Sequence, residues 1–420
     1  MPREPGTPAA YNRPPMPNPV LPSACDVLVV GAGPAGSACA QTLAQAGHDV
    51  LLVDQHDFPR DKICGDGLIP DAHRALRRLG VLDEVMALAR HVKHVRCIAP
   101  RGGMIDVPGS LAVLPRKQLD HILVKSAQGA GAKLATPVRF DVLLEEGGRV
   151  VGARLKVGEA LHEVRARWVV MATGAVPQAL ISAGLCERRT PSGVALRGYV
   201  KNDAMVGRIT ELEVVWHPRL RGGYGWIFPA PDGQFNIGTG VTGSHDMHRG
   251  RHTMQDVNLR RMFETFCEVH PPARELVAGG QWVGEIKGAP LRCSLVGAQL
   301  FKPGVLVTGE AAGSTYAFTG EGIGKAMETG MLAADALRQG PQDDAGVRQR
   351  YEASIQALQP KFKLYEHAQR VNSHPWLADL VIWRARKSPR VLRRMSGVLE
   401  ETSNPGNLVS AKGLLRLFTE

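Results

Sequence analysis

Long apolar runs are missing from this sequence. Its 420 residues contain no stretch of eighteen or more apolar residues, and no apolar signal-peptide core follows Met1. A helix that spans a bilayer needs about 20 such residues, so we expect neither a transmembrane helix nor a secretory leader. The sequence therefore predicts a cytoplasmic protein.

Cysteines are few and scattered. This pattern predicts reduced thiols and argues against a disulfide framework, a zinc site or an iron–sulfur cluster. No ligand cluster stands out among the 14 histidines, and we expect no metal. The seven cysteines, an odd number without a CxxC pair, are Cys25, Cys39, Cys64, Cys97, Cys186, Cys267 and Cys293.

Nucleic-acid-binding signatures are also missing, although the formal net charge is +11. We find no zinc-finger, RNP or helix-turn-helix pattern, and we expect no nucleic acid as a partner. About half of the excess charge lies between Pro360 and Glu420, where eleven Lys or Arg residues stand against five Asp or Glu residues.

The bulk composition is that of a globular protein, with 44% hydrophobic and 22% charged residues. The length favours two interleaved domains over a single core. Residues 1–23 hold eight prolines and few large apolar residues, so we expect this tail to be disordered. After about residue 340 the pattern becomes helical.

A dinucleotide-binding pattern opens the ordered part of the chain. In CDVLVVGAGPAG, an apolar strand at 27–30 leads into Gly31, Gly33 and Gly36, and a helix follows. These glycines permit a tight turn, close approach of a pyrophosphate and close packing of helix on strand. A second apolar strand at 50–53 ends in Asp54, where an acid can accept hydrogen bonds from ribose hydroxyls. The alternative is a tight structural turn.

A second pattern, GVLVTGEAAGSTYAFTGEGIG, decides between NAD and FAD. An apolar strand at 305–308 reaches Gly309 and Glu310, and a helix opens at GEGI. This segment resembles the second FAD fingerprint of flavoproteins with the p-hydroxybenzoate hydroxylase fold. The resemblance implies FAD, with the acid on the ribityl chain and the helix N-terminus facing the pyrophosphate and flavin. Glu310 stands where that family usually has Asp. An ordinary strand–turn–helix is the alternative.

Two shorter segments fit the same fold. PRKQLDHIL resembles the family's Arg-x-x-Leu-Asp helix, which implies that Arg116 lies near the flavin, although alone it is an ordinary amphipathic helix. WVVMATGA resembles a late strand of the fold, with Gly174 close to the adenosine half. Many hydroxylases carry Asp-Gly near this place and use it in handling NADPH, whereas this chain has Thr173-Gly174. The electron donor is therefore open between NADPH and a protein.

Two further motifs narrow the resemblance to the geranylgeranyl reductase family. DKICGDGL at 61–68 resembles that family's Lys-x-Cys-Gly segment, and GGYGWIFP at 222–229 is similar to its Tyr-x-Trp-x-Phe-Pro motif. Related flavin halogenases carry a similar Trp-x-Trp-x-Ile-Pro. The resemblance covers roughly residues 24–340. It implies reduction of carbon–carbon double bonds in an isoprenoid lipid.

The aromatic motif itself has a simple geometry. In a strand, Tyr224, Trp226 and Phe228 leave one face, and Gly223 and Gly225 leave the other. The resemblance implies a strand that roofs the flavin, whose rings line a channel for an elongated apolar substrate. The glycines then let neighbouring backbone approach from behind. The alternative is that the rings are ordinary sheet core.

Cys64 has two interpretations. It is either a small buried apolar residue or, as the resemblance implies, a group beside the flavin that donates a proton or shapes the flavin's surroundings. A strand would bring Lys62 next to the thiol and lower its pKa. The candidate catalytic residues are Cys64, Tyr224 and Trp226, and the candidate substrate-binding residues are Tyr224, Trp226, Phe228 and Pro229.

These patterns together predict an α/β fold in which a Rossmann-type FAD-binding domain is interleaved with a mixed β-sheet substrate domain, followed by a C-terminal helical region. We assign 24–90, 115–175 and 290–340 to FAD binding, 91–114 and 176–289 to the substrate domain, and 341–420 to the helical region. The expected cofactor-binding residues are Gly31, Gly33, Pro34, Ala35, Gly36, Asp54, Gln55, Cys64, Gly65, Arg116, Gly174, Glu310, Gly320, Gly322 and Ile323.

The tail carries tryptophan and arginine at near-helical spacing. Trp376 and Trp383 precede a basic run, which suits an anionic membrane surface. The alternative is a helix that packs on the catalytic body with its arginines solvated. Of two remaining polar residues, we expect Lys325 to face solvent and Asn236 to be structural.

Three functions compete. The first is an FAD-dependent reductase that delivers hydride to an isolated double bond and needs an acid that the sequence does not identify. The second is a flavin monooxygenase or halogenase acting on an apolar or aromatic substrate. The third is a flavin-bearing scaffold without catalysis, because a fold alone does not settle function.

Overall fold

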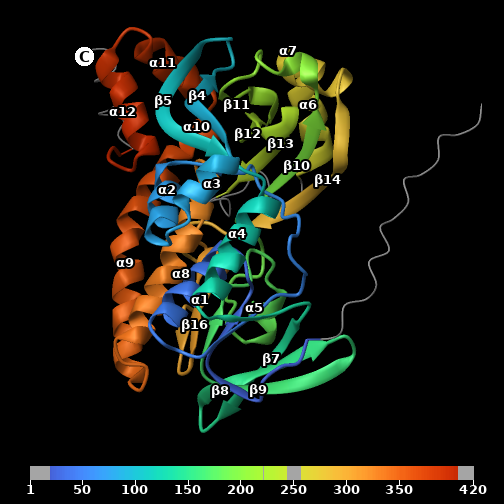
Figure 1. Cartoon of the computed structure of the whole chain (residues 1–420). Helices are drawn as coiled ribbons and strands as arrows, with labels where there is room; N and C mark the ends of the chain where they lie inside the picture. Colours follow the sequence, from blue (N-terminus) through green and yellow to red (C-terminus); the bar gives the residue numbers. More distant parts are fainter. Residues whose placement is uncertain (1–18, 221, 244–256, 405–420) are drawn as a thin grey trace, which may run out of the picture.

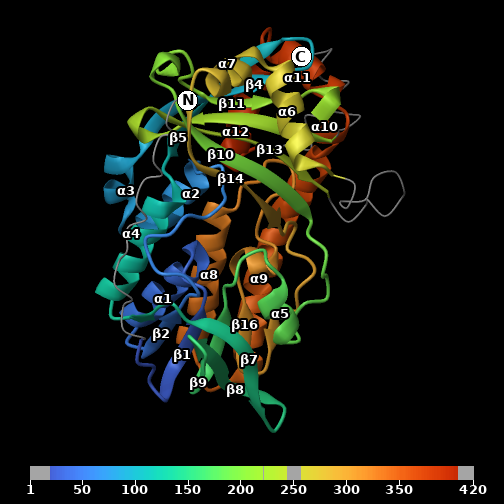
Figure 2. The same cartoon turned by 90° about the vertical axis from the view of Figure 1, so that its right-hand side faces the viewer.

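The molecule is built on two β-sheets joined by helices (Figure 1). The computed structural model describes residues 19–220, 222–243 and 257–404, and most of the predicted disordered tail at 1–23 lies outside them. One sheet lies at each end of the molecule, with α8 (Ile323–Arg338) and the long α9 (Asp344–Ala368) running beside the first (Figure 2). The predicted α/β class with a helical C-terminal region is confirmed.

The first sheet has a parallel core. Its strand order is β15-β16-β9-β1-β2-β6, and β8 adds antiparallel to β9 and carries β7. The short apolar runs VLVV and VLLV are buried on both faces, which is typical of parallel strands. The strands are β1 (Ala24–Val30), β2 (Val50–Val53), β6 (Lys133–Ala135), β7 (Arg139–Glu146), β8 (Arg149–Val157), β9 (Ala160–Met171), β15 (Phe301–Lys302) and β16 (Val305–Val307).

Helices cover one face of this sheet. Val27 and Val29 pack with residues of α1 (Pro34–Gln45), α4 (Arg116–Gly129), α8 and α9, whereas Leu28 and Val30 pack with β8 and α5 (Gln178–Ser182). Gly330 of α8 lies against the backbone of Ala35, where an added Cβ would overlap the carbonyl oxygen. The two helices that follow the predicted fingerprints are therefore in direct contact.

The second sheet is mostly antiparallel. Its order is β14-β10-β13-β12-β11-β4-β5-β3, and only β11 with β4 is parallel among these pairs. Helices α6 (Leu259–Val269) and α7 (Pro271–Ala278) pack on its outer face. The strands are β3 (Gly67–Leu68), β4 (Arg90–Ile98), β5 (Met104–Val113), β10 (Gly193–Lys201), β11 (Leu212–Val215), β12 (Gly223–Pro229), β13 (Gln234–Thr242) and β14 (Gln281–Leu291).

Strand β12 alternates as its sequence predicts, but side chains rather than backbone fill most of the space behind it. A Cβ on Gly225 would overlap the ring of Phe266, and one on Gly223 would meet Met262 as well as the Gly240 carbonyl. Backbone approaches Gly223 as expected, whereas at Gly225 the ring of Phe266 from α6 takes the space that a side chain would fill.

Five further helices complete the described structure. Pro389 begins α12 and separates it from α11, whose apolar face packs on β4 and β5. No helix within the described part of the chain combines the length and apolar character that crossing a membrane demands. The division into domains stays a prediction; β3, expected in the FAD-binding part, pairs with the second sheet. These helices are α2 (Pro70–Arg78), α3 (Leu82–Leu88), α10 (Arg370–Ser373), α11 (Trp376–Ala385) and α12 (Pro389–Leu399).

We expect Gly225→Ala to lower the free energy of unfolding by about 1–3 kcal/mol, because the new methyl group overpacks against Phe266. Chemical unfolding measures this change. Gly129→Ala is the control, since its Cβ would enter open space at the end of α4. Equal stability of the two variants would contradict the packing described for β12.

Candidate active site

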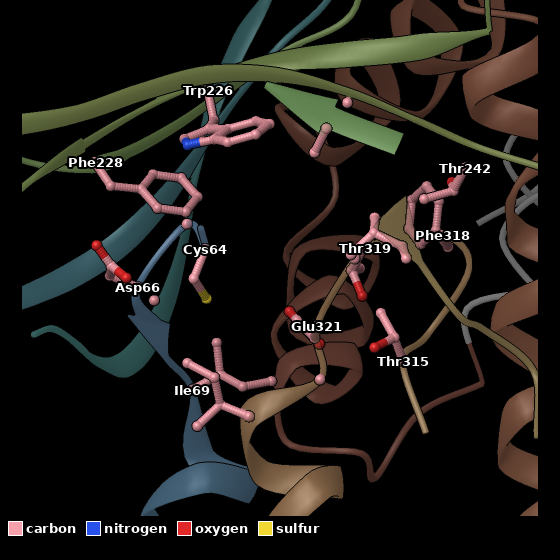
Figure 3. Close-up of a pocket in the computed structure, with 18 of the residues that line it drawn as sticks. Cys64, Asp66, Ile69, Trp226, Phe228, Thr242, Thr315, Phe318, Thr319 and Glu321 are labelled. Carbon is pink, nitrogen blue, oxygen red and sulfur yellow. The ribbon is translucent and has the colours of Figure 1, made fainter. Parts of the chain in front are cut away.

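A cavity of about 380 Å³ lies between the two sheets. Its walls come from the glycine turn after β1, the segment around Cys64, the aromatic face of β12, the loop before α8, and α11. Figure 3 shows Cys64, Trp226 and Phe228 on one side of this space and Thr315, Phe318 and Thr319 on the other, with Glu321 between them.

The glycine turn forms one end of the cavity. Gly31 has a positive φ of 102°, and a Cβ on Gly36 would overlap the Gly31 carbonyl oxygen, so both positions require glycine. Asp54 fixes the turn by accepting hydrogen bonds from the backbone N–H groups of Ala32 at 2.8 Å and His56 at 3.0 Å. The turn and the end of β2 are thus one rigid unit.

Most of the predicted cofactor-binding residues line this cavity. Three of the predicted site residues do not line it: Gly36 packs inside the turn, Gln55 is exposed, and Pro229 pairs with Phe235 at the end of β12. The lining residues among the predicted set are Gly31, Gly33, Pro34, Ala35, Asp54, Cys64, Gly65, Arg116, Gly174, Tyr224, Trp226, Phe228, Glu310, Gly320, Gly322 and Ile323.

Positive charge surrounds the glycine turn. Arg116 is buried and pairs with Asp120 through contacts of 2.6 and 2.8 Å, and its guanidinium lies close to Gly33. Arg60, which sequence reasoning missed, lies on the same turn and contacts Asp120 at 3.0 Å. A glycine backbone flanked by two guanidinium groups fits a pyrophosphate.

A buried hydroxyl gives a second sign that the site is built for a polar ligand. Thr173 Oγ1 has no hydrogen-bond partner among the described residues and lies on the cavity next to Gly174. Buried polar atoms are normally satisfied, so this orphan suits a ligand group. Glu310 also lines the cavity and accepts a hydrogen bond from Thr315 Oγ1 at 3.3 Å. The residues present therefore fit a flavin dinucleotide.

The Cys64 segment is a loop, not a strand, and two side chains of the second sheet hold it. Arg197 donates to the Cys64 carbonyl at 3.3 Å and to the Lys62 carbonyl at 2.9 Å, and Asn236 donates to the Cys64 carbonyl at 2.8 Å. Burial raises the pKa of the Cys64 thiol, and Asp66 raises it further against the opposing charge of Arg116. The expected activation by Lys62 in a strand is therefore wrong.

A buried polar network extends from this loop to the aromatic strand. Tyr199 and Asn236 both donate to Asp66 Oδ2, and Trp226 Nε1 donates to Asn236 Oδ1 at 2.9 Å. Burial raises the pKa of Asp66 to about 6, although Arg197 and Tyr199 favour its ionised form. Asn236 therefore fixes the orientation of the Trp226 indole, which agrees with its predicted structural role.

The three rings of β12 both pack and line the cavity. Tyr224 and Trp226 have ring centroids 6.2 Å apart, and Trp226 and Phe228 6.4 Å, so they form a continuous aromatic wall. Tyr224 donates to the Thr319 carbonyl at 2.5 Å. Apolar residues of β4, β5 and α11 extend this wall: Val95, Cys97, Val107, Ala378, Val381 and Ile382.

Lys325 does not face solvent as expected. Its side chain is 1% exposed and pairs with Glu401 at 2.7 Å and Glu328 at 2.5 Å. Burial opposes the charge of Lys325, but these partners and Asp71 raise its pKa overall. Glu401 lies 76 residues further along the chain, so no local pattern could predict this buried pair.

Comparison with known proteins identifies a matching family and several relatives of this chain. Residues 24–212 match the model of the FAD binding domain family. The chain is 33% identical over 331 residues to the menaquinone reductase of Mycolicibacterium smegmatis, covering 75% of this chain and 76% of that protein. It is 30% identical over 323 residues to digeranylgeranylglycerophospholipid reductase 1 of Methanopyrus kandleri, covering 76% and 82%.

Solved structures share the fold. A geranylgeranyl bacteriochlorophyll reductase-like protein from Thermoplasma acidophilum has a TM-score of 0.71 and 23% identity, covering 95% of this chain and 96% of that one. A triple mutant of a flavin-dependent brominase has a TM-score of 0.74 and 18% identity, covering 94% and 98%. The predicted flavoprotein fold and FAD as its cofactor are confirmed.

We expect Asp54→Ala to weaken FAD binding roughly 10- to 100-fold, because two hydrogen bonds to a charged group that fix the glycine turn are lost. Fluorescence titration of the apoprotein with FAD measures this. Asp57→Ala, an exposed acid three residues further on, is the matched control. Equal dissociation constants would contradict the role of Asp54.

Proposed function

The chain belongs to the geranylgeranyl reductase family of FAD-dependent oxidoreductases, and we propose that it reduces carbon–carbon double bonds in an isoprenoid chain. One observation carries this proposal. The cavity that begins at the glycine turn is also lined by apolar side chains of β12, β4 and α11. An isoprenoid has no polar handle along its length, so shape and apolar area must hold it.

FAD, once reduced, supplies a hydride to an acceptor carbon. Arg116, Arg60 and the glycine turn would hold the dinucleotide, and Glu310 would contact its ribityl chain. Tyr224, Trp226 and Phe228 position the double bond and exclude water, which an isolated alkene requires because it is a poor hydride acceptor. Cys64, held through its carbonyl by Arg197 and Asn236, shapes the flavin's surroundings.

We expect the protein, reduced by dithionite without oxygen, to be reoxidised by a geranylgeranyl lipid, with product two mass units heavier for each bond reduced. Absorbance of the flavin and mass spectrometry measure this. Chemical reduction makes the test independent of the natural electron donor. A flavin that stays reduced until oxygen is admitted would contradict the proposal and favour oxygenase or halogenase chemistry.

We further propose that α11 and α12 touch an anionic membrane surface from which the lipid enters. The inner face of α11 packs on the catalytic body, but Trp376 and Trp383 are 55% and 45% exposed on its outer side. Lys387 lies over the Trp383 ring at 4.7 Å. Each basic residue near an anionic surface contributes about 1 kcal/mol; those of this segment are Arg386, Lys387, Arg390, Arg393 and Arg394.

We expect the double variant Trp376→Ala/Trp383→Ala to bind phosphatidylglycerol vesicles at least about 10-fold more weakly, because two interfacial anchors are lost. Vesicle co-sedimentation at two salt concentrations measures this. Trp282→Ala removes a 38% exposed tryptophan from β14 and is the control. If all three proteins sediment alike, the membrane proposal is wrong.

A further inference from the structure

A carboxyl group projects into the cavity from the loop before α8. Glu321 lies two residues after Thr319 and just before α8. It lines the same space as Cys64, Trp226 and Phe228 (Figure 3). The loop is fixed at both ends, because Tyr224 donates to the Thr319 carbonyl and the Tyr316 N–H donates to the Glu321 carbonyl at 2.8 Å. The carboxyl therefore has a defined place beside the reacting groups.

The groups that face Glu321 favour its protonated form. Burial and the charge of Asp71 on α2 raise the pKa of Glu321 to about 8, with Glu401 acting in the same direction and Lys325 on α8 opposing. Two further titratable side chains near Glu321 are Tyr224 on β12 and Tyr365 on α9. Burial raises the pKa of both phenols. At neutral pH the Glu321 carboxyl thus holds a proton inside an apolar cavity.

Several ionisable side chains lie behind Glu321 and act on it electrostatically. Asp71 lies over Gly324, where a Cβ would overlap its carboxyl, and its pKa is raised by burial to about 7. Lys325 pairs with Glu401, whose other oxygen contacts Arg74 at 2.7 Å and Lys361 at 3.2 Å. The side chains of Arg74 and Lys361 are 50% and 44% exposed, so this group of charges extends from the cavity to the surface.

Resting on the function proposed above, we propose that Glu321 is the catalytic proton donor of double-bond reduction. The π bond breaks as hydride from the reduced cofactor forms a C–H bond at one alkene carbon. The Glu321 O–H proton forms the C–H bond at the other carbon, so the alkene gains two electrons and two hydrogens. The Glu321 carboxylate then regains its proton from solvent.

Cys64 is the rival donor on the same cavity. Its thiol is also neutral, but burial raises its pKa above the ordinary thiol value. A carboxyl that releases its proton near neutral pH is the better general acid, because the efficiency of proton transfer depends on a pKa near the working pH. The chemistry therefore favours Glu321 over Cys64.

We expect Glu321→Gln to slow anaerobic reoxidation of the reduced protein by a geranylgeranyl lipid by about 100-fold or more. Bound FAD should be unchanged, and Glu321→Asp should recover part of the rate. The wild-type rate should fall as pH rises through about 8, as the carboxyl loses its proton. Glu163→Gln, an exposed acid on β9, is the control, and Cys64→Ala tests the rival.

A second readout does not depend on turnover. Infrared difference spectra of the apoprotein across this pH range should contain a protonated-carboxyl band that Glu321→Gln lacks and Glu163→Gln keeps. A wild-type rate in Glu321→Gln, or loss of rate in Cys64→Ala alone, would overturn the assignment while leaving the reductase intact. Failure of the wild type itself to react with the lipid would instead overturn the proposed function, and the donor role with it.

Discussion

The attachment of the Cys64 loop to the second sheet is the constraint on which the site depends. The loop leaves the first sheet, yet Arg197 of β10 and Asn236 of β13 hold its backbone carbonyls, and Asp66 is bonded by Tyr199 and Asn236. These buried polar groups are costly unless satisfied. Because Arg197, Tyr199 and Asn236 all belong to the other sheet, they fix the two layers relative to one another, and the cavity between them keeps its shape.

A second set of buried charges lies behind the cavity, around Glu401. Glu401 would be costly to bury alone, and Lys325, Tyr316 and Lys361 hold its pKa at about 2 despite that burial. Replacing such a group by an apolar one of similar size is often neutral or stabilising. Lys325 and Glu401 therefore need not stabilise the fold, and their charges act on the Glu321 carboxyl.

Local patterns predicted what local chemistry determines. Gly31, Gly36 and Asp54 were predictable because a turn and a strand end lie within one short segment, and the shared face of Tyr224, Trp226 and Phe228 followed from the period of a strand. Arg60, Arg197 and Asp66 were not, because their roles depend on contacts across sheets. The prediction that Lys325 faces solvent was wrong for the same reason. Its partner Glu401 follows the end of α12, and no local sequence pattern indicates that a lysine on a helix is buried.

The two different faces of β12 limit how its length can change. One face presents rings to the cavity, and the other presents glycines that receive Phe266 and Met262 of α6. A shift of register by one residue exchanges the faces of a strand, so it would drive three rings into α6 and leave glycines along the substrate wall. Single-residue insertions or deletions here are thus doubly disallowed. A change of two residues would instead keep each side chain of the strand on its own face.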